Sequence, residues 1–62
     1  MTTRVAVIGA AGRMGRNLVI ACHEADDAEL TVATEQLGNP FLKKDAGELA
    51  GLDPVGVRLT TD

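Results

Sequence analysis

The stretch Val5-Ala-Val-Ile-Gly-Ala-Ala-Gly-Arg-Met-Gly15 decides how this chain folds. Its first four residues are all apolar, as expected of a strand that is buried on both faces of a parallel sheet. Glycines follow with the spacing Gly9-x-x-Gly12-x-x-Gly15, and an amphipathic segment begins without a break. An apolar strand, a glycine turn and a helix in this order are typical of a βαβ unit. The sequence therefore predicts an α/β fold.

The three glycines are expected to serve different purposes. Gly9 ends the strand and can adopt backbone angles that are closed to residues with a Cβ. Gly12 has no side chain, so an anionic group can approach the main chain there, whereas Gly15 lets the helix pack closely on the strand. The first N–H groups of a helix have no partner within it, and the helix dipole favours negative charge beside them. The turn therefore predicts a pyrophosphate-binding site.

One acidic residue supports a dinucleotide as the ligand. The turn differs from the commoner G-x-G-x-x-G because Ala11 replaces the second glycine, and the alternative is a turn in which glycine serves only geometry. Glu35, however, lies 20 residues beyond Gly15 and directly follows the alternating, β-branched run at residues 30–34. Dinucleotide folds place an acid at this distance to bind the ribose hydroxyls. Glu35 is therefore predicted to bind ribose, the alternative being a solvated carboxylate at a strand end.

Hydrophobic periodicity predicts three strands and one long helix. We expect strands at residues 4–8, 29–34 and 56–60 and a helix at residues 13–25. Residues 36–54 are rich in Gly, Pro, Lys and Asp and are predicted to form a loop, with one helical turn at residues 45–49. Apolar residues at helical spacing predict the buried face of the long helix: Met14, Leu18, Ala21, Cys22 and Ala25.

The length of the chain limits what it can contain. Sixty-two residues allow at most one small domain. A complete dinucleotide fold has two mononucleotide-binding halves and about six strands. Residues 1–62 are therefore expected to be the N-terminal part of the dinucleotide-binding domain of a longer protein. Because nothing would cover the second face of its sheet, the isolated chain is expected to be unstable or to associate through that face.

Charge and composition exclude several functional classes. The net charge is −3, yet residues 1–23 carry three arginines and no carboxylate, which suits an anionic ligand at the glycine turn. The overall acidity and the lack of a basic-aromatic stripe argue against nucleic acid. We expect a soluble cytoplasmic protein, since no apolar run is long enough to cross a membrane and no signal peptide is visible. The single cysteine excludes an internal disulfide, and no Cys or second His has metal-ligand spacing, so no metal site is expected.

Two segments in order resemble one enzyme family. Residues 5–15, above all Gly-Arg-Met-Gly at 12–15, resemble the start of the 4-hydroxy-tetrahydrodipicolinate reductases, formerly called dihydrodipicolinate reductases. Residues 16–18, Glu35 and the segment Asp-Ala-Gly-Glu-Leu-Ala-Gly at 45–51 are similar to that family as well, so the resemblance covers nearly the whole chain. It implies an enzyme of lysine and diaminopimelate biosynthesis that transfers a hydride from NADH or NADPH to a cyclic dicarboxylate, reducing 4-hydroxy-tetrahydrodipicolinate to tetrahydrodipicolinate.

The resemblance further implies a cytoplasmic homotetramer with two domains. The N-terminal domain would bind the dinucleotide, and a second α+β domain would bind the substrate and form the tetramer. The catalytic histidine and lysine of the family lie in that second domain, so no catalytic residue is assigned here. The cofactor-binding residues carried over by position are Gly9, Ala10, Ala11, Gly12, Arg13 and Met14 for the pyrophosphate, and Glu35 with Gln36 for the adenosine ribose.

Other assignments stay open at this point. The chain can also be the nucleotide-binding part of another oxidoreductase, such as a malate dehydrogenase or an extended short-chain dehydrogenase. A truncated chain without catalytic activity is a further alternative, and the 62 residues alone are expected to be inactive.

The residue after Glu35 bears on the choice of cofactor. In some members of the family that the chain resembles, this residue is an arginine that can pair with the 2′-phosphate of NADPH, whereas here it is Gln36. A neutral amide cannot form a bidentate ion pair with phosphate, and the Glu35 carboxylate repels the added charge. The sequence therefore predicts a preference for NADH over NADPH, which is modest if Arg13 reaches the adenosine side.

Overall fold

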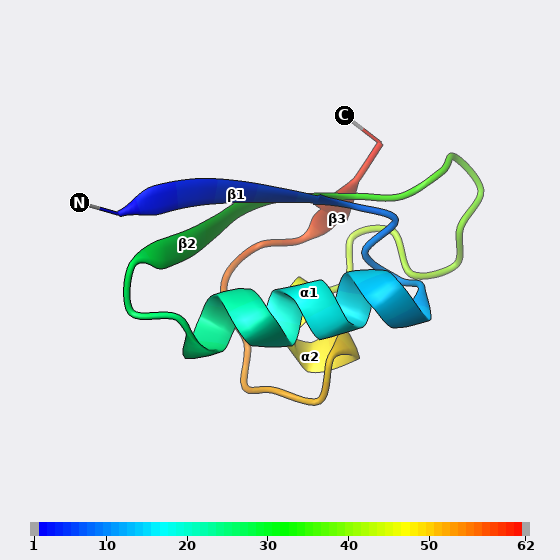
Figure 1. Cartoon of the computed structure of the whole chain (residues 1–62). Coiled ribbons are helices and arrows are strands. Elements are labelled where there is room, and N and C mark those ends of the chain that lie inside the picture. The colour runs from blue at the N-terminus through cyan, green and yellow to red at the C-terminus, as the bar shows by residue number, and fades with distance from the viewer. Residues whose placement is uncertain (1, 62) are drawn as a thin grey trace.

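Three strands form one parallel sheet in the order β1-β2-β3 in a computed structural model, which describes residues 2–61. The elements are β1 (Thr3–Ile8), α1 (Arg13–Glu24), β2 (Ala28–Thr34), α2 (Ala46–Leu49) and β3 (Leu59–Thr60). Both helices lie on the same face of the sheet, so the chain has two layers (Figure 1). Parallel strands joined through a helix in this order are the N-terminal βαβ part of a Rossmann-type domain, as predicted.

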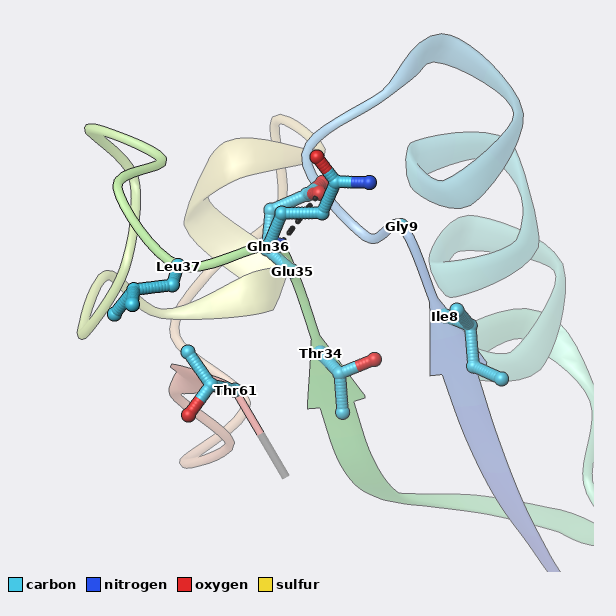
Figure 2. Close-up of a pocket in the computed structure, with 7 residues that line it drawn as sticks. All are labelled: Ile8, Gly9, Thr34, Glu35, Gln36, Leu37 and Thr61. Atoms are coloured by element: carbon cyan, nitrogen blue, oxygen red, sulfur yellow. Dashed lines mark hydrogen bonds between the residues drawn. The ribbon is translucent and has the colours of Figure 1, made fainter.

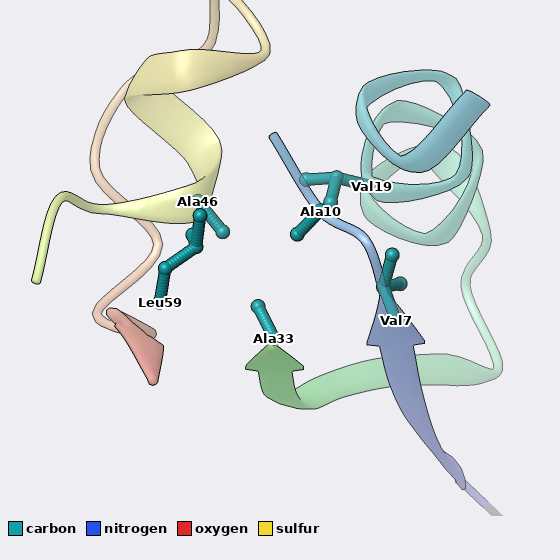
Figure 3. Packing of buried hydrophobic residues seen from close by; sticks show 6 residues of the cluster. All are labelled: Val7, Ala10, Val19, Ala33, Ala46 and Leu59. Carbon is teal, nitrogen blue, oxygen red and sulfur yellow. The ribbon is translucent and has the colours of Figure 1, made fainter. Parts of the chain in front are cut away.

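The core lies between the sheet and the two helices. Its buried apolar side chains come from all five elements and from the turn after β1 (Figure 3): Val7, Ala10, Val19, Ala33, Ala46 and Leu59. Val7 is 2% exposed, whereas the next residue, Ile8, is 85% exposed. Within residues 2–61 the first strand is therefore buried on one face only, as expected for a chain in which nothing covers the second face of the sheet. Side chains alternate along a strand, and among residues 2–61 the helices cover only the face that Val7 occupies.

The packing of α1 depends on Gly15. A Cβ at Gly15 would overlap the carbonyl oxygen of Gly9 and would lie 2.7 Å from the Cα of Ala10. Only glycine therefore lets α1 approach the turn this closely, which is the packing role that the sequence predicted. The other buried residues of α1, Val19 and Cys22, lie on the same face of the helix as Gly15.

The predicted buried face of α1 is wrong in part. Cys22 is buried as expected, but Met14 is 76% exposed and Leu18 is 50% exposed. Met14 and Leu18 each precede a buried residue of α1, Gly15 and Val19. Successive residues of a helix are rotated by about 100°, so Met14 and Leu18 lie on the face next to the buried one. The close contact at Gly15 turns the face with Gly15 and Val19 toward the sheet, and the face with Met14 and Leu18 therefore stays exposed.

The third strand is shorter than predicted. Only Leu59 and Thr60 pair with β2, at Ala33 and Thr34. The preceding residues pair with another neighbour, since the N–H of Ala46 donates to the carbonyl oxygen of Val57 at 2.8 Å. Leu59 also exchanges two backbone hydrogen bonds with residues 43 and 44, at 2.8 and 2.9 Å. Residues 43–46 thereby cover the outer edge of β3.

The other predicted elements are close to those observed. The first two strands each begin one residue earlier than expected, and α1 ends one residue earlier, at Glu24. The helical turn predicted in the long loop is α2, and Asp45 caps its N-terminus. Within residues 2–61, no helix is long and apolar enough to span a membrane.

The close contact at Gly15 predicts that Gly15→Ala destabilises the protein. Alanine raises helix propensity by about 1 kcal/mol, but its Cβ would force the backbone of the turn to move, and such overpacking costs about 1–3 kcal/mol. We expect the free energy of unfolding in urea to fall. Gly12→Ala is the control, because its Cβ would lie 3.4 Å from the nearest atom, the Gly9 carbonyl oxygen. Equal stability of the two variants would contradict the packing role of Gly15.

Candidate functional site

The turn between β1 and α1 is tied to the end of β2. Gly9 has a φ of 73°, in the left-handed region that favours glycine. The N–H groups of Gly9 and Ala10 both donate to the carbonyl oxygen of Thr34, at 2.9 and 3.0 Å. The N–H of Gly12 donates to the carbonyl oxygen of Gly9 at 3.0 Å. The first half of the turn therefore uses its own donors to hold its shape.

The second half of the turn leaves donors free. The N–H groups of Arg13, Met14 and Gly15 have no hydrogen-bond acceptor among the residues that the structure describes. Bonding within the helix starts with the N–H of Arg16, which donates to the carbonyl oxygen of Gly12 at 2.9 Å. Gly12 is the N-cap residue and has no side chain that could satisfy these donors. Three adjacent donors at the positive end of the α1 dipole can hold an anionic group.

Glu35 stands directly after β2, and its carboxylate is directed toward this turn (Figure 2). Its Oε2 accepts the N–H of Ala11 at 3.1 Å, and its Oε1 accepts the N–H of Gln36 at 3.1 Å. An ionised carboxylate has about four acceptor positions. Both oxygens therefore keep the capacity to accept hydroxyl groups of a ligand.

A hollow of about 440 Å³ opens beside Glu35 at the carboxyl ends of the strands. Open α/β sheets bind their ligands at this end of the strands. Its lining residues, labelled in Figure 2, are Ile8, Gly9, Thr34, Glu35, Gln36, Leu37 and Thr61. A second hollow of about 290 Å³ adjoins it and shares Leu37 and Thr61. A ligand that spans the turn and the hollow would meet the free donors and then the carboxylate.

The structure brings most of the predicted site residues together. Gly9, Glu35 and Gln36 line the hollow, and the N–H of Ala11 meets the carboxylate of Glu35. Ala10 instead belongs to the core, where its side chain is 1% exposed. Its backbone N–H already donates to the carbonyl oxygen of Thr34, so Ala10 has no free N–H to offer an anion.

The remaining predicted residues lie at the start of α1. Gly12 precedes the helix as its N-cap, and Arg13 and Met14 are its first two residues, both with exposed side chains. The prediction that the Met14 side chain packs in the core is wrong, because this stripe of α1 does not face the sheet. Its backbone N–H is among the free donors at the start of α1.

Four residues that line the hollow were not predicted from the sequence: Ile8, Thr34, Leu37 and Thr61. Each of them ends a strand or follows one within three residues. Their position at the carboxyl ends of parallel strands is the signal that could have found them. Their residue types carry no such signal, since apolar and hydroxyl side chains are common at any strand end.

The fold and the turn define a nucleotide-binding βαβ unit of Rossmann type. The family model described as "Dihydrodipicolinate reductase, N-terminus" matches residues 3–62. The chain therefore belongs to the dihydrodipicolinate reductase family and corresponds to the N-terminal part of its members.

Curated relatives agree with this assignment. The chain is 53% identical over 62 residues to the 4-hydroxy-tetrahydrodipicolinate reductase of Alkalilimnicola ehrlichii, which covers 100% of the chain and 23% of the relative. It is 51% identical over 57 residues to the protein of the same name in Sinorhizobium fredii, covering 92% of the chain and 21% of the relative. The Rhizobium meliloti protein of that name is 49% identical over the same coverage. The chain thus spans less than a quarter of the length of these relatives.

The second segment of the family resemblance, residues 45–51, has a structural role centred on Asp45. Its Oδ2 accepts the N–H groups of Glu48 and Val55, at 3.1 and 3.0 Å, and its Oδ1 accepts the N–H of Gly56 at 2.9 Å. Burial raises the pKa of this carboxyl, but these hydrogen bonds and the N–H of Gly47 hold the pKa below its ordinary value of 3.8. Asp45 thereby closes the loop that leads to β3 and to the wall of the hollow.

The lowered pKa of Asp45 predicts a contribution to acid sensitivity. The pKa of Asp45 is lower in the folded than in the unfolded protein. Ionised Asp45 therefore stabilises the fold at any pH above its pKa in the unfolded protein. This stabilisation is lost as the pH falls through its pKa in the folded protein. Asp45→Asn should lower the free energy of unfolding at pH 7 and flatten its decline below about pH 5. Urea unfolding at a series of pH values measures both effects. Asp53→Asn, on the same loop, is the control, and an unchanged pH slope in Asp45→Asn would refute the assignment.

Proposed function

We propose that this chain supplies the pyrophosphate- and ribose-binding half of the NAD(P)H site of a 4-hydroxy-tetrahydrodipicolinate reductase. The complete enzyme would reduce 4-hydroxy-tetrahydrodipicolinate to tetrahydrodipicolinate in lysine and diaminopimelate biosynthesis. The observation that carries this proposal is the row of three free N–H groups at the start of α1, beside a carboxylate with spare acceptor positions. Donors for an anion and an acceptor for hydroxyls are the two features by which a protein binds the adenosine diphosphate part of a dinucleotide.

Each residue of the site has a separate task in this proposal. The N–H groups of Arg13 and Met14 bind the pyrophosphate, and Gly12 leaves the approach to them open. The carboxylate of Glu35 accepts the hydroxyl groups of the adenosine ribose, and Gln36 lies beside the 2′ position. Gly9, Ala10 and Ala11 form the backbone of the turn that holds these groups in place.

The hydride comes from the nicotinamide of the bound cofactor, and residues 1–62 serve only to bind and orient its other half. We assign no catalytic residue to this chain. The small dicarboxylate substrate, the catalytic groups and the contacts of a homotetramer would belong to a second domain, and the enzyme would be cytoplasmic. The 62 residues alone would therefore be inactive. A chain that binds nucleotide without taking part in catalysis is the remaining alternative.

The charges around Glu35 favour NADH over NADPH. A 2′-phosphate would stand next to the Glu35 carboxylate, and the neutral amide of Gln36 offers no charge to offset the repulsion. The guanidinium of Arg13 is exposed at the start of α1 and can offset part of it.

We expect the complete enzyme to use NADH with a higher kcat/KM than NADPH. The difference should be about three- to tenfold, which corresponds to about 1 kcal/mol of unbalanced charge interaction at an exposed site. Steady-state kinetics with both cofactors at saturating substrate measures it. A kcat/KM at least tenfold higher with NADPH would overturn the proposed roles of Glu35 and Gln36.

Gln36→Arg should shift the selectivity of the complete enzyme toward NADPH. A new ion pair with the 2′-phosphate at this exposed position is worth about 1 kcal/mol, so the ratio of the two kcat/KM values should move about fivefold. Gln36→Met, which has a similar length and no charge, is the control and should leave the ratio nearly unchanged. An equal shift in both variants would show that the amide, and not the missing cation, sets the preference.

A further inference from the structure

We propose that Glu35 has a second role: its carboxylate holds the phosphate-binding turn in its binding shape before any ligand arrives. This inference rests on the proposed function in so far as the ligand is a pyrophosphate group. Glu35 would then be a positioning residue for the pyrophosphate as well as the acceptor of the ribose hydroxyls.

The hydrogen bond between Glu35 and Ala11 is the basis of this proposal. It joins residues that are 24 positions apart, from the end of β2 to the middle of the glycine turn, and measures 3.1 Å from N to Oε2. A second hydrogen bond, from the N–H of Gln36 to Oε1, fixes the other oxygen of the same carboxylate. Figure 2 shows the side chain extended toward the turn and the second of these bonds. With both oxygens held by backbone donors, the carboxylate has little freedom to rotate away.

Two further hydrogen bonds connect the turn to β2 within residues 2–61, and they stop short of the residues that would bind the anion. The carbonyl oxygen of Thr34 holds the N–H groups of Gly9 and Ala10. The next N–H along the chain, that of Ala11, is the one that Glu35 binds. This bond therefore holds the turn one residue closer to Gly12. The residues with free N–H groups at the start of α1 come directly after Gly12.

The same bond also divides the donors of the turn between two tasks. Because the N–H of Ala11 already serves the carboxylate, an incoming pyrophosphate is directed to the free N–H groups of Arg13 and Met14. The spare acceptor positions of Glu35 remain for the ribose hydroxyls. One side chain thus places both parts of the ligand relative to each other.

If Glu35 holds the turn, removal of its carboxylate should change anion affinity in the opposite direction from that expected for simple charge repulsion. Removal of a carboxylate near an anion site should strengthen anion binding if the charge only repels the anion. If the carboxylate holds the turn, however, Glu35→Ala should weaken the binding of an anion that has no ribose. Inorganic pyrophosphate is such a probe. Glu35→Gln separates the two effects, because its side-chain oxygen can still accept the N–H of Ala11 while its charge is gone.

The experiment uses the complete enzyme, with wild type, Glu35→Ala and Glu35→Gln compared with Glu24→Ala, which removes an exposed carboxylate at the other end of α1. Hydrogen–deuterium exchange is followed at the amide of Ala11, and inorganic pyrophosphate is titrated while the amide resonances of Arg13 and Met14 are observed. In Glu35→Ala, the Ala11 amide should exchange about tenfold faster, as expected for the loss of one hydrogen bond to a charged group. Pyrophosphate affinity should fall about fivefold. Glu35→Gln should keep slow exchange at Ala11 and should bind pyrophosphate at least as tightly as the wild type, and Glu24→Ala should keep both properties near the wild-type values.

The possible results separate this inference from the proposed function. Tighter pyrophosphate binding by Glu35→Ala, or unchanged exchange at Ala11, would overturn the positioning role, even if the wild-type enzyme binds NADH. A wild-type enzyme that binds neither NADH nor pyrophosphate would instead overturn the proposed function. In that case, faster hydrogen–deuterium exchange at Ala11 in Glu35→Ala, seen in no other variant, would still show that the carboxylate of Glu35 holds the turn.

Discussion

The approach of α1 to the turn at Gly9 and Ala10 is the constraint on which the rest of this structure depends. At Gly15 there is no room for a Cβ, so the helix axis and its rotation are both fixed by a backbone contact. That rotation brings Val19 and Cys22 into the core. It also fixes where the first turn of α1 ends, and with it the direction of the three free N–H groups. The packing of the helix and the geometry of the proposed anion site are therefore consequences of one missing methyl group.

The sheet supplies the second half of this arrangement. Thr34 ends β2 and holds the glycine turn through its carbonyl oxygen, and Glu35 follows with a carboxylate that reaches the same turn. The loop at Asp45 leads the chain back so that β3 can pair with β2 at Thr34. The apolar core is small, and its contribution scales with the area that it buries. Backbone hydrogen bonds around the strand ends therefore have a large share in fixing the site.

Much of this could be predicted from the sequence, because local backbone geometry determines it. The positive φ of Gly9 and the contact at Gly15 follow from a strand, a tight turn and a helix in succession, and only glycine fits there. The position of Glu35 follows from the length of one helix and one strand. The exposed faces were harder to predict. A count of apolar residues favoured the stripe of Met14 and Leu18, since periodicity gives the width of a face but not the contact that orients it.

Contacts between segments distant in sequence could not be predicted in this way. The alternation of Val57 and Leu59 predicts a strand, but it does not specify whether β2 or residues 43–46 pair with it. The hydrogen bond from Ala11 to Glu35 likewise joins two segments whose separate patterns predict a turn and a ribose acceptor, without indicating that they touch. Such pairings depend on the placement of whole elements, which single-sequence patterns do not contain.

In the proposed assignment, the double use of Glu35 links the rigidity of the site to its choice of cofactor. A carboxylate held by two backbone N–H groups would not turn away from an added 2′-phosphate, so the feature that orders the turn would also maintain the repulsion. Arginine at position 36 adds attraction but leaves that repulsion in place. Replacement of Glu35 by a small neutral residue removes the repulsion and also releases the N–H of Ala11. On this proposal, selectivity for the cofactor and order of the turn would not change independently at this position, unless the new side chain retained an acceptor for the N–H of Ala11.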